Sequence, residues 1–261
     1  MDILNAVILG VIEGITEFLP ISSTGHLLIA EHWLGKQSDT FNIVIQAGAI
    51  LAVTAIYWKR LWTLVVDMRL PENRAYLGKL IVAFLITAVL GLVAKKLGFS
   101  LPETLQPVAW ALIIGGFWIF VAEWIAAKQP DRTEVTWLVA ILVGIAQVVA
   151  GIFPGTSRSG ATIFAAMLAG TSNRAAATEF AFLAGIPTMY AASAYEIYDQ
   201  WKTGGVNENW TALAVAFSVS TITAFAAVSW LLKYIRSNRF TAFAIYRIVV
   251  GAVLLAISPG R

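Results

Sequence analysis

Cysteine is absent from the 261-residue sequence, and charged side chains make up only 13% of it. The absence of cysteine excludes disulfides, thiol catalysis and cysteine-ligated iron–sulfur clusters. The shortage of charge argues against a soluble domain, because such a domain ordinarily carries about 25% charged residues. The formal net charge of +3 is small and spread along the chain, so we expect no binding to nucleic acid.

Long apolar stretches take the place of the absent charges. Hydrophobic residues make up 59% of the chain, and six stretches contain no charged residue at all. Most approach the length that a helix needs to cross a bilayer, and the shorter ones extend through flanking residues whose charged ends reach the interface. We therefore expect an all-α polytopic membrane protein with a single membrane domain over residues 1–261. The six stretches are 40–58, 80–94, 104–122, 180–195, 210–232 and 248–260.

The second half of the sequence repeats the first at an offset of about 134 residues. GVIEGITEFLPISS, from Gly10, corresponds to GIAQVVAGIFPGTS, from Gly144, which pairs Pro20 with Pro154 and Ser23 with Ser157. Further matches follow in the same order along both halves. This order predicts an internal duplication with repeats of about 1–130 and 131–261.

Each half begins with a broken apolar segment, 3–30 or 135–170, and continues with three of the apolar stretches. Proline, glycine and small hydroxyl residues interrupt each broken segment, leaving two arms that are short for a full crossing. Such arms are typical of re-entrant helical hairpins, whose tips lie inside the protein. A pair of kinked spanning helices is the alternative.

The basic residues favour an inverted arrangement of the two repeats. If 59–79, 128–134, 174 and 233–239 lie on one side, that side holds 11 Lys and Arg residues and is expected to be cytoplasmic. Three spans in each half then place the second repeat upside down relative to the first. We predict an inverted-topology repeat of six transmembrane helices plus two re-entrant helical hairpins, with a site where the tips meet. The other side holds Lys36, Lys95, Lys96, Lys202 and Arg261.

The first broken segment carries acids, hydroxyls and a histidine in the stretch EGITEFLPISSTGH, residues 13–26. Glu13 and Glu17 are four residues apart and share a helix face, where they repel unless a proton or a cation lies between them. After the proline, Ser22 or Ser23 is expected to cap the second arm, with His26 returning to the same side.

The second broken segment repeats this pattern with a positive charge. Pro154 and Gly155 break the chain, Thr156 or Ser157 caps the next arm, and Arg158 occupies its first turn. Two helix N-termini and a guanidinium make an anion site suited to phosphate. Carboxylates, a hydroxyl and a histidine facing phosphate point to phosphoryl transfer.

Structural roles are also compatible with several of these residues. Serine and threonine in membrane helices commonly bond to the main chain, and His26 could be a packing residue. Arg247 is expected either to pair with a carboxylate that stabilises the bundle or to act in the site. Inverted repeats with broken helices also occur in secondary transporters and lipid flippases, which do not require a hydroxyl and a histidine opposite an arginine.

EGITEFLPISSTGH and PGTSRSGAT, residues 154–162, resemble the two signature regions of the undecaprenyl-diphosphatase family, the BacA-type bacitracin-resistance proteins. The resemblance extends over essentially the whole chain, including FNIVIQAGAILAV and FAIYR. It implies hydrolysis of the C55 isoprenoid diphosphate to its monophosphate plus phosphate, which recycles the carrier lipid for cell-wall synthesis. It also implies a homodimer in the bacterial inner membrane, a site open to the periplasm, and a divalent cation, Mg²⁺ or Ca²⁺.

The resemblance and the motif chemistry together suggest a mechanism. Ser23 attacks the terminal phosphorus, His26 or Glu17 takes its proton, and Arg158 stabilises the transferred group. Glu13 and Glu17 alternatively hold the cation, and direct attack by water is equally compatible. The residues expected to contact phosphate are Ser22, Thr24, Gly25, Gly155, Thr156, Ser157, Ser159 and Thr162.

Overall fold

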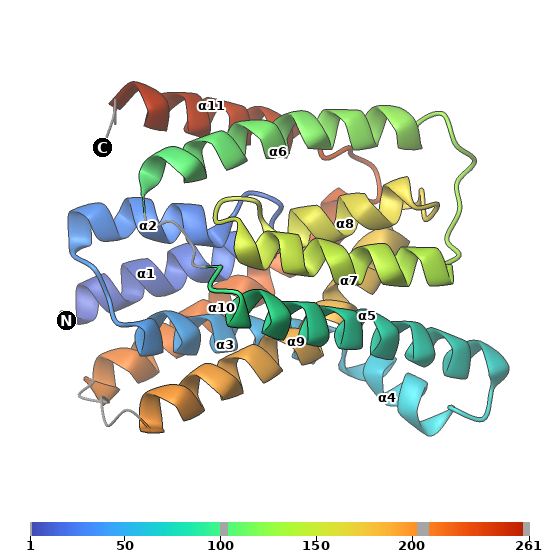
Figure 1. Ribbon diagram of the computed structural model, residues 1–261, viewed down its shortest axis with the longest axis horizontal. Coiled ribbons are helices and arrows are strands. Elements are labelled where there is room, and N and C mark those ends of the chain that lie inside the picture. The colour runs from blue at the N-terminus through green and yellow to red at the C-terminus, as the bar shows by residue number, and fades with distance from the viewer. Residues whose placement is uncertain (1, 100–103, 203–208, 258–261) are drawn as a thin grey trace.

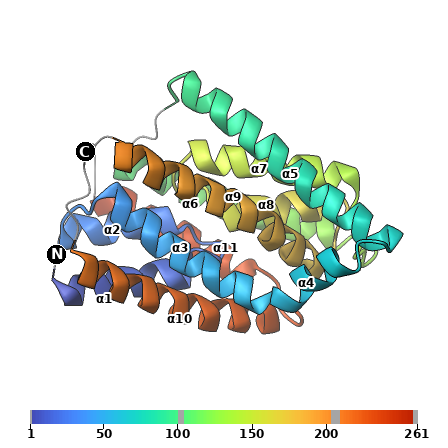
Figure 2. The same cartoon turned by 90° about the horizontal axis from the view of Figure 1, so that it is seen from below.

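The computed structural model describes residues 2–99, 104–202 and 209–257, and all regular secondary structure in these ranges is helical (Figure 1). This confirms the expectation of an all-α chain. The long helices run roughly along the long axis of the molecule (Figures 1 and 2). The helices of the first half are α1 (Ile3–Thr16), α2 (Ser23–Leu34), α3 (Asp39–Ile56), α4 (Trp58–Val66), α5 (Pro71–Lys96) and α6 (Leu105–Ala126). Those of the second half are α7 (Trp137–Ile152), α8 (Arg158–Leu168), α9 (Arg174–Lys202), α10 (Trp210–Tyr234) and α11 (Thr241–Ile257).

Four helices of the described chain are long and apolar enough to cross a membrane, namely α3, α5, α6 and α10. With the six apolar stretches of the sequence, they identify a polytopic membrane protein. The 17 residues of α11 place it among the shorter apolar helices, and residues 258–260 of the stretch expected at 248–260 lie outside the described residues. Although α9 has 29 residues, it is less apolar. Its charged residues lie toward its two ends, at Arg174 and Glu179 and at Glu196, Asp199 and Lys202, and it packs against α3, α5, α7 and α8.

The two broken segments form helical hairpins that open toward opposite ends of the molecule. In Figure 1, α1 and α2 extend from their turn to the left-hand end, whereas α7 and α8 extend to the right-hand end. The four arms contain 11 to 16 residues each. At about 1.5 Å per residue they reach roughly 17–24 Å, less than the roughly 30 Å of a hydrocarbon core. Each arm is therefore shorter than a full crossing, and the two turns lie side by side, joined by the hydrogen bond from Ser159 to the Leu19 carbonyl.

Equivalent helices of the two halves make equivalent contacts. α1 packs against α10 of the second half, and α7 packs against α5 of the first half. Both contacts depend on glycine. A Cβ on Gly10 would lie 2.7 Å from the carbonyl oxygen of Ala216, and one on Gly144 would lie 2.8 Å from that of Ala83. The two glycines that the sequence offset pairs thus allow the same close backbone approach.

Candidate active site

Two serines cap the inner arms of the hairpins with the same unusual backbone. Ser22 has φ 75° and Ser157 has φ 69°, the only positive values among non-glycine residues of the described chain. The hydroxyl oxygen of Ser22 accepts a hydrogen bond from the Gly25 amide at 3.2 Å. That of Ser157 accepts one from the Gly160 amide at the same distance. Backbone strain of this kind concentrates at functional sites.

These caps decide two choices that the sequence left open. Ser22 rather than Ser23 caps α2, and Ser157 rather than Thr156 caps α8. The geometric partner of Ser157 is therefore Ser22, one residue away from the pairing with Ser23 that the sequence offset suggested. As a result, Ser23 and Arg158 occupy the same position, the first residue of each inner arm.

Ser23 is paired with Glu17 across the first turn. The Ser23 hydroxyl donates a hydrogen bond to Oε2 of Glu17, and both side chains are buried. The other carboxylate oxygen of Glu17 accepts a weaker bond from the Gln46 amide of α3, at 3.5 Å. Glu17 is thus placed to receive the proton of Ser23.

Glu13 lies one helical turn before Glu17, whose amide donates to the Glu13 carbonyl at 2.9 Å. The side chain of Glu13 is 1% exposed, and its Oε2 has no hydrogen-bond partner in the described chain. It interacts electrostatically with both Glu17 and Arg158. No group of three or more His, Cys, Asp or Glu side chains that could hold a metal occurs among the described residues. Two carboxylates with one unpartnered oxygen still fit Mg²⁺ or Ca²⁺, which take further oxygen ligands from water and substrate phosphates.

Arg158 completes the site from the second hairpin. It lines a small polar cavity between the two turns, of about 30 Å³, and also lines a second small cavity that includes Glu17 and Gln147. The hydroxyl, the carboxylate and the guanidinium expected from the sequence therefore surround one space. The polar cavity is lined by Glu17, Ser22, Ser23, Thr24, Gln46, Ala150, Gly155, Ser157 and Arg158.

His26 does not turn toward Ser23 as expected. Its Nδ1 lies 2.7 Å from the Ser22 carbonyl oxygen, and its Nε2 lies 2.7 Å from the hydroxyl of Tyr246 on α11. The two rings are stacked, with an interplanar angle of 6°. Because both ring nitrogens have other partners, Glu17 and not His26 is the group in place to take the Ser23 proton.

The remaining hydroxyls predicted to contact phosphate are bonded to the protein. Ser159 donates to the Leu19 carbonyl at 3.0 Å and so ties the two turns together. Thr162 donates to the carbonyl of Arg158 at 2.8 Å. Gly25, also predicted to contact phosphate, uses its amide in the α2 cap. Contact of Ser159, Thr162 and Gly25 with phosphate stays a prediction.

Arg247 pairs with main-chain carbonyls and not with a carboxylate. Its side chain is 1% exposed and donates to five carbonyl oxygens at 3.0–3.3 Å. One guanidinium therefore binds both hairpin turns and α6, which assigns it to positioning the site. The five carbonyls belong to Pro20 of the first turn, Gly155 and Thr156 of the second turn, and Ala111 and Leu112 of α6.

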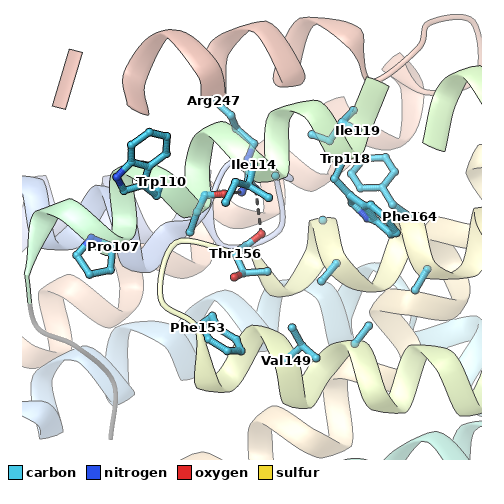
Figure 3. A pocket seen from close by; sticks show the side chains of 16 residues that line it. Pro107, Trp110, Ile114, Trp118, Ile119, Val149, Phe153, Thr156, Phe164 and Arg247 are labelled. Atoms are coloured by element: carbon cyan, nitrogen blue, oxygen red, sulfur yellow. Dashed lines mark hydrogen bonds between the residues drawn. The ribbon is translucent and has the colours of Figure 1, made fainter. Parts of the chain in front are cut away.

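An apolar groove lies beside the second turn (Figure 3). Its volume is about 540 Å³, and side chains of α6, α7 and α8 form its walls. Thr156 and Arg247 lie at its polar edge, and the dashed line in Figure 3 marks their hydrogen bond. Trp110, Ile114 and Phe153 are all more than half exposed along it, so the groove opens on the apolar outer surface.

The sequence matches a family described as "Bacitracin resistance protein BacA" over residues 6–253. The chain belongs to this family. An "Undecaprenyl-diphosphatase" of Rhizobium etli is 74% identical over 259 residues, which cover 99% of this chain and 98% of that protein. A protein of the same name from Xanthomonas oryzae pv. oryzae is 61% identical with the same coverage.

The sequence analysis missed three site features of this BacA-family chain. Gln46 and Asn42 are the two amide side chains in the apolar stretch 40–58, which is a signal that could have identified Gln46. Tyr246 and the carbonyl-binding role of Arg247 gave no such signal, because their partners lie more than 90 residues away. Only the folded chain brings α11 against both turns.

Proposed function

We propose that this BacA-family protein is an undecaprenyl-diphosphate phosphatase, which hydrolyses the C55 isoprenoid diphosphate to the monophosphate plus phosphate. This reaction recycles the carrier lipid of cell-wall synthesis, and it underlies resistance to bacitracin. The observation that carries the proposal is the hydrogen bond from Ser23 to Glu17, beside Arg158, at the meeting point of two helix N-termini. The relatives named undecaprenyl-diphosphatase, at 61–74% identity over nearly the whole chain, support it.

The residues suggest a two-step transfer. The Ser23 oxygen attacks the terminal phosphorus and its proton passes to Glu17. The bond to the bridging oxygen breaks, and Glu17 gives its proton to the lipid monophosphate as that group leaves. Glu17, ionised again, takes a proton from the water that attacks the phosphorylated serine and passes it to the Ser23 oxygen as that bond to phosphorus breaks, which releases phosphate and restores the hydroxyl. Arg158 and the first amides of α2 and α8 stabilise the charge on the transferred group.

Glu13 and Glu17 are the residues that would hold a divalent cation, Mg²⁺ or Ca²⁺. Bound there, the cation supplies positive charge to the diphosphate oxygens. The unpartnered Oε2 of Glu13 and its burial support this assignment.

Glu13→Gln is expected to raise the cation concentration that supports half-maximal activity by at least about tenfold, since losses of supporting groups at metal sites commonly cost 10–100-fold in affinity. Cation titration of phosphate release measures this. The matched control is Glu31→Gln, which removes a carboxylate at the far end of the same hairpin and should leave the cation requirement unchanged. An unchanged cation requirement in Glu13→Gln would show that the two acids share a proton instead.

The apolar groove of Figure 3 is the proposed place of the isoprenoid tail. A diphosphate held at the second turn has the groove directly beside it, past Thr156. An extended tail there stays against apolar side chains and the surrounding lipid, so binding of the diphosphate exposes none of the tail to water.

Purified protein in detergent, given C55 diphosphate and the C15 analogue, tests the function and the groove together. We expect phosphate release from both, with a lower KM for the longer chain. No phosphate release from either, although the lipid binds, would favour the alternative of a secondary transporter or polyprenyl-phosphate flippase.

We further propose that the chain forms an inverted repeat of six membrane-spanning helices and two re-entrant hairpins in the bacterial inner membrane, with the site facing the periplasm. The equivalent contacts of α1 and α7, and the opening of the two hairpins toward opposite ends, support it. The basic residues of 59–79, 128–134 and 233–239 lie at the end where the second hairpin opens (Figure 1). We also propose that the protein forms a homodimer, and this proposal is based only on the family resemblance.

Cysteine substitutions test the orientation cleanly, because the chain has no cysteine of its own. Lys36→Cys and Lys202→Cys should react with an impermeant thiol reagent added to spheroplasts. Arg69→Cys and Arg74→Cys should react only after the membrane is opened. The reverse labelling pattern would place the site on the cytoplasmic side.

A further inference from the structure

A polar cavity of about 480 Å³ lies at the basic end of the molecule, away from the hairpin turns. The C-terminal end of α6, the N-terminal end of α9 and the turn between α10 and α11 surround it. Arg236 and Arg239 of that turn line it, together with Gln129, Ser172 and Asn173.

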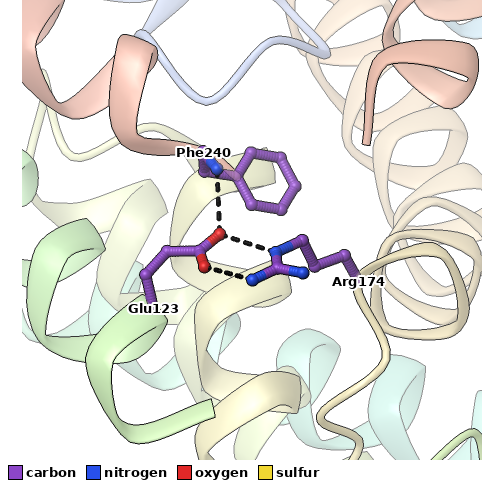
Figure 4. Close-up of polar contacts among 3 residues, drawn as sticks. All are labelled: Glu123, Arg174 and Phe240. Atoms are coloured by element: carbon purple, nitrogen blue, oxygen red, sulfur yellow. Dashed lines mark hydrogen bonds and ion pairs between the residues drawn. The ribbon is translucent and has the colours of Figure 1, made fainter. Parts of the chain in front are cut away.

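A buried carboxylate fixes the walls of this cavity (Figure 4). Glu123 accepts hydrogen bonds from Nε and a terminal nitrogen of Arg174, at 2.8 and 2.6 Å. It also accepts one from the Phe240 amide at 2.8 Å. One side chain of α6 therefore holds both the start of α9 and the α10–α11 turn. Glu123 also neutralises Arg174, so that arginine adds little charge to the cavity.

The positive charge of the polar cavity comes from two arginines of the α10–α11 turn. The Arg236 and Arg239 side chains form no ion pair or hydrogen bond within the described chain. The one carboxylate at the cavity, Asp131, accepts hydrogen bonds from the Asn173 amide at 3.0 and 3.2 Å. Two unpaired guanidiniums against one carboxylate leave the cavity positive.

An apolar cavity of about 560 Å³ adjoins the polar one, and Arg239 and Ala127 line both. Its other walls include Phe120, Val121 and Trp124 of α6. Trp124 is 61% exposed, and the Lys128 ammonium lies 3.3 Å from its ring centre. Aromatic and lysine side chains placed in this way are typical of the boundary between lipid tails and head groups.

We propose that the two cavities bind one anionic phospholipid, with its phosphate at Arg236 and Arg239 and an acyl chain along α6. An anionic phospholipid fits because a positively charged cavity adjoins an apolar one. A soluble anion would use the arginines but leave the apolar cavity without a partner, and a neutral lipid would leave the two guanidiniums uncompensated. Arginine forms paired hydrogen bonds with phosphate oxygens, and the charge complementarity favours an acidic head group. Glu123 and Arg174 are positioning residues for this site.

Native mass spectrometry of the purified full chain, titrated with phosphatidylglycerol or phosphatidylcholine, tests the proposal. We expect one phosphatidylglycerol to be retained in preference to phosphatidylcholine. Arg236→Ala/Arg239→Ala should weaken its binding by about thirtyfold, because each basic residue at a lipid surface contributes about fivefold. The matched control, Arg69→Ala/Arg74→Ala, removes the same charge at the same end and should bind as the unmodified chain does.

Three results would overturn the proposal. They are equal retention of the two lipids, equal weakening by the control pair, and displacement of the lipid by millimolar inorganic phosphate, which would identify a soluble anion as the ligand. If the double alanine variant fails to fold, Arg236→Lys/Arg239→Lys tests the proposal instead. It keeps both charges but loses the planar guanidinium groups, so it should bind phosphatidylglycerol with intermediate affinity. Phosphate release from the lipid diphosphate should be kept in all these variants and reports that the fold is intact.

Discussion

Ser23→Ala is expected to lower kcat by at least about a thousandfold while leaving the fold intact. The hydroxyl that donates to Glu17 is removed, and with it the atom proposed to attack phosphorus. Losing an activated nucleophile commonly costs this much or more, because binding and charge stabilisation alone provide the residual rate. Phosphate release under saturating lipid diphosphate measures kcat, and the elution profile in detergent reports folding.

Ser22→Ala is the matched control one residue earlier. It removes the cap on the Gly25 amide and should cost about 1 kcal/mol of stability, with activity retained within about tenfold. If Ser23→Ala also stayed within tenfold, the serine would not be the nucleophile. Water activated by Glu17 would then attack directly, or His26 would serve after turning away from Tyr246.

Arg247→Lys is expected to produce the largest loss of stability among single conservative substitutions. The carbonyls of Pro20, Gly155 and Thr156 lie outside the helices and depend on the guanidinium, whereas the two of α6 keep their helix bonds. An ammonium is a single nitrogen and cannot reach both turns at once, so we expect about two of the three turn carbonyls to lose their partner. Each unsatisfied buried group costs about 1–3 kcal/mol, which predicts a total of about 2–6 kcal/mol. Activity should fall as well, because the same bonds set the separation of the two turns.

The temperature at which half of the detergent-solubilised protein aggregates measures this effect. Arg69→Lys, at an exposed position before α5, serves as the control and should not change that temperature. An Arg247→Lys variant with unchanged stability and activity would mean that water or lysine replaces the lost bonds and that the guanidinium is dispensable.

Local chemistry explains which parts of the site could be predicted from the sequence. Proline next to glycine or small hydroxyl residues favours a break in a helix, so both hairpin turns and the hydroxyl and arginine after them were visible in the sequence. A lone proline is a weaker signal, since Pro187 lies inside α9. Which of Ser22 and Ser23 caps α2 could not be predicted, because both have good capping side chains. The positive φ of Ser22 is imposed by the packed turn.

Long-range partners account for the rest. His26 sits at the spacing that would return it to Ser23, but the Tyr246 hydroxyl, 220 residues later, takes its Nε2. The six apolar stretches were recognisable from composition, because each lacks charged residues over most of the length of a helix. Which helices pack together is a property of the whole chain and not of any local pattern.

The position of Arg247 has a consequence for how the protein is made. Synthesis runs from the N-terminus, so both hairpins are made well before α11, the last of the described helices. Until α11 docks against α6, the carbonyls of Pro20, Gly155 and Thr156 lack the guanidinium that joins the two turns. A nascent chain that still lacks α11 therefore holds every proposed catalytic residue without the bonds that join the two turns. Completion of the active site thus waits until α11 has been made and has docked, long after both hairpins have left the ribosome.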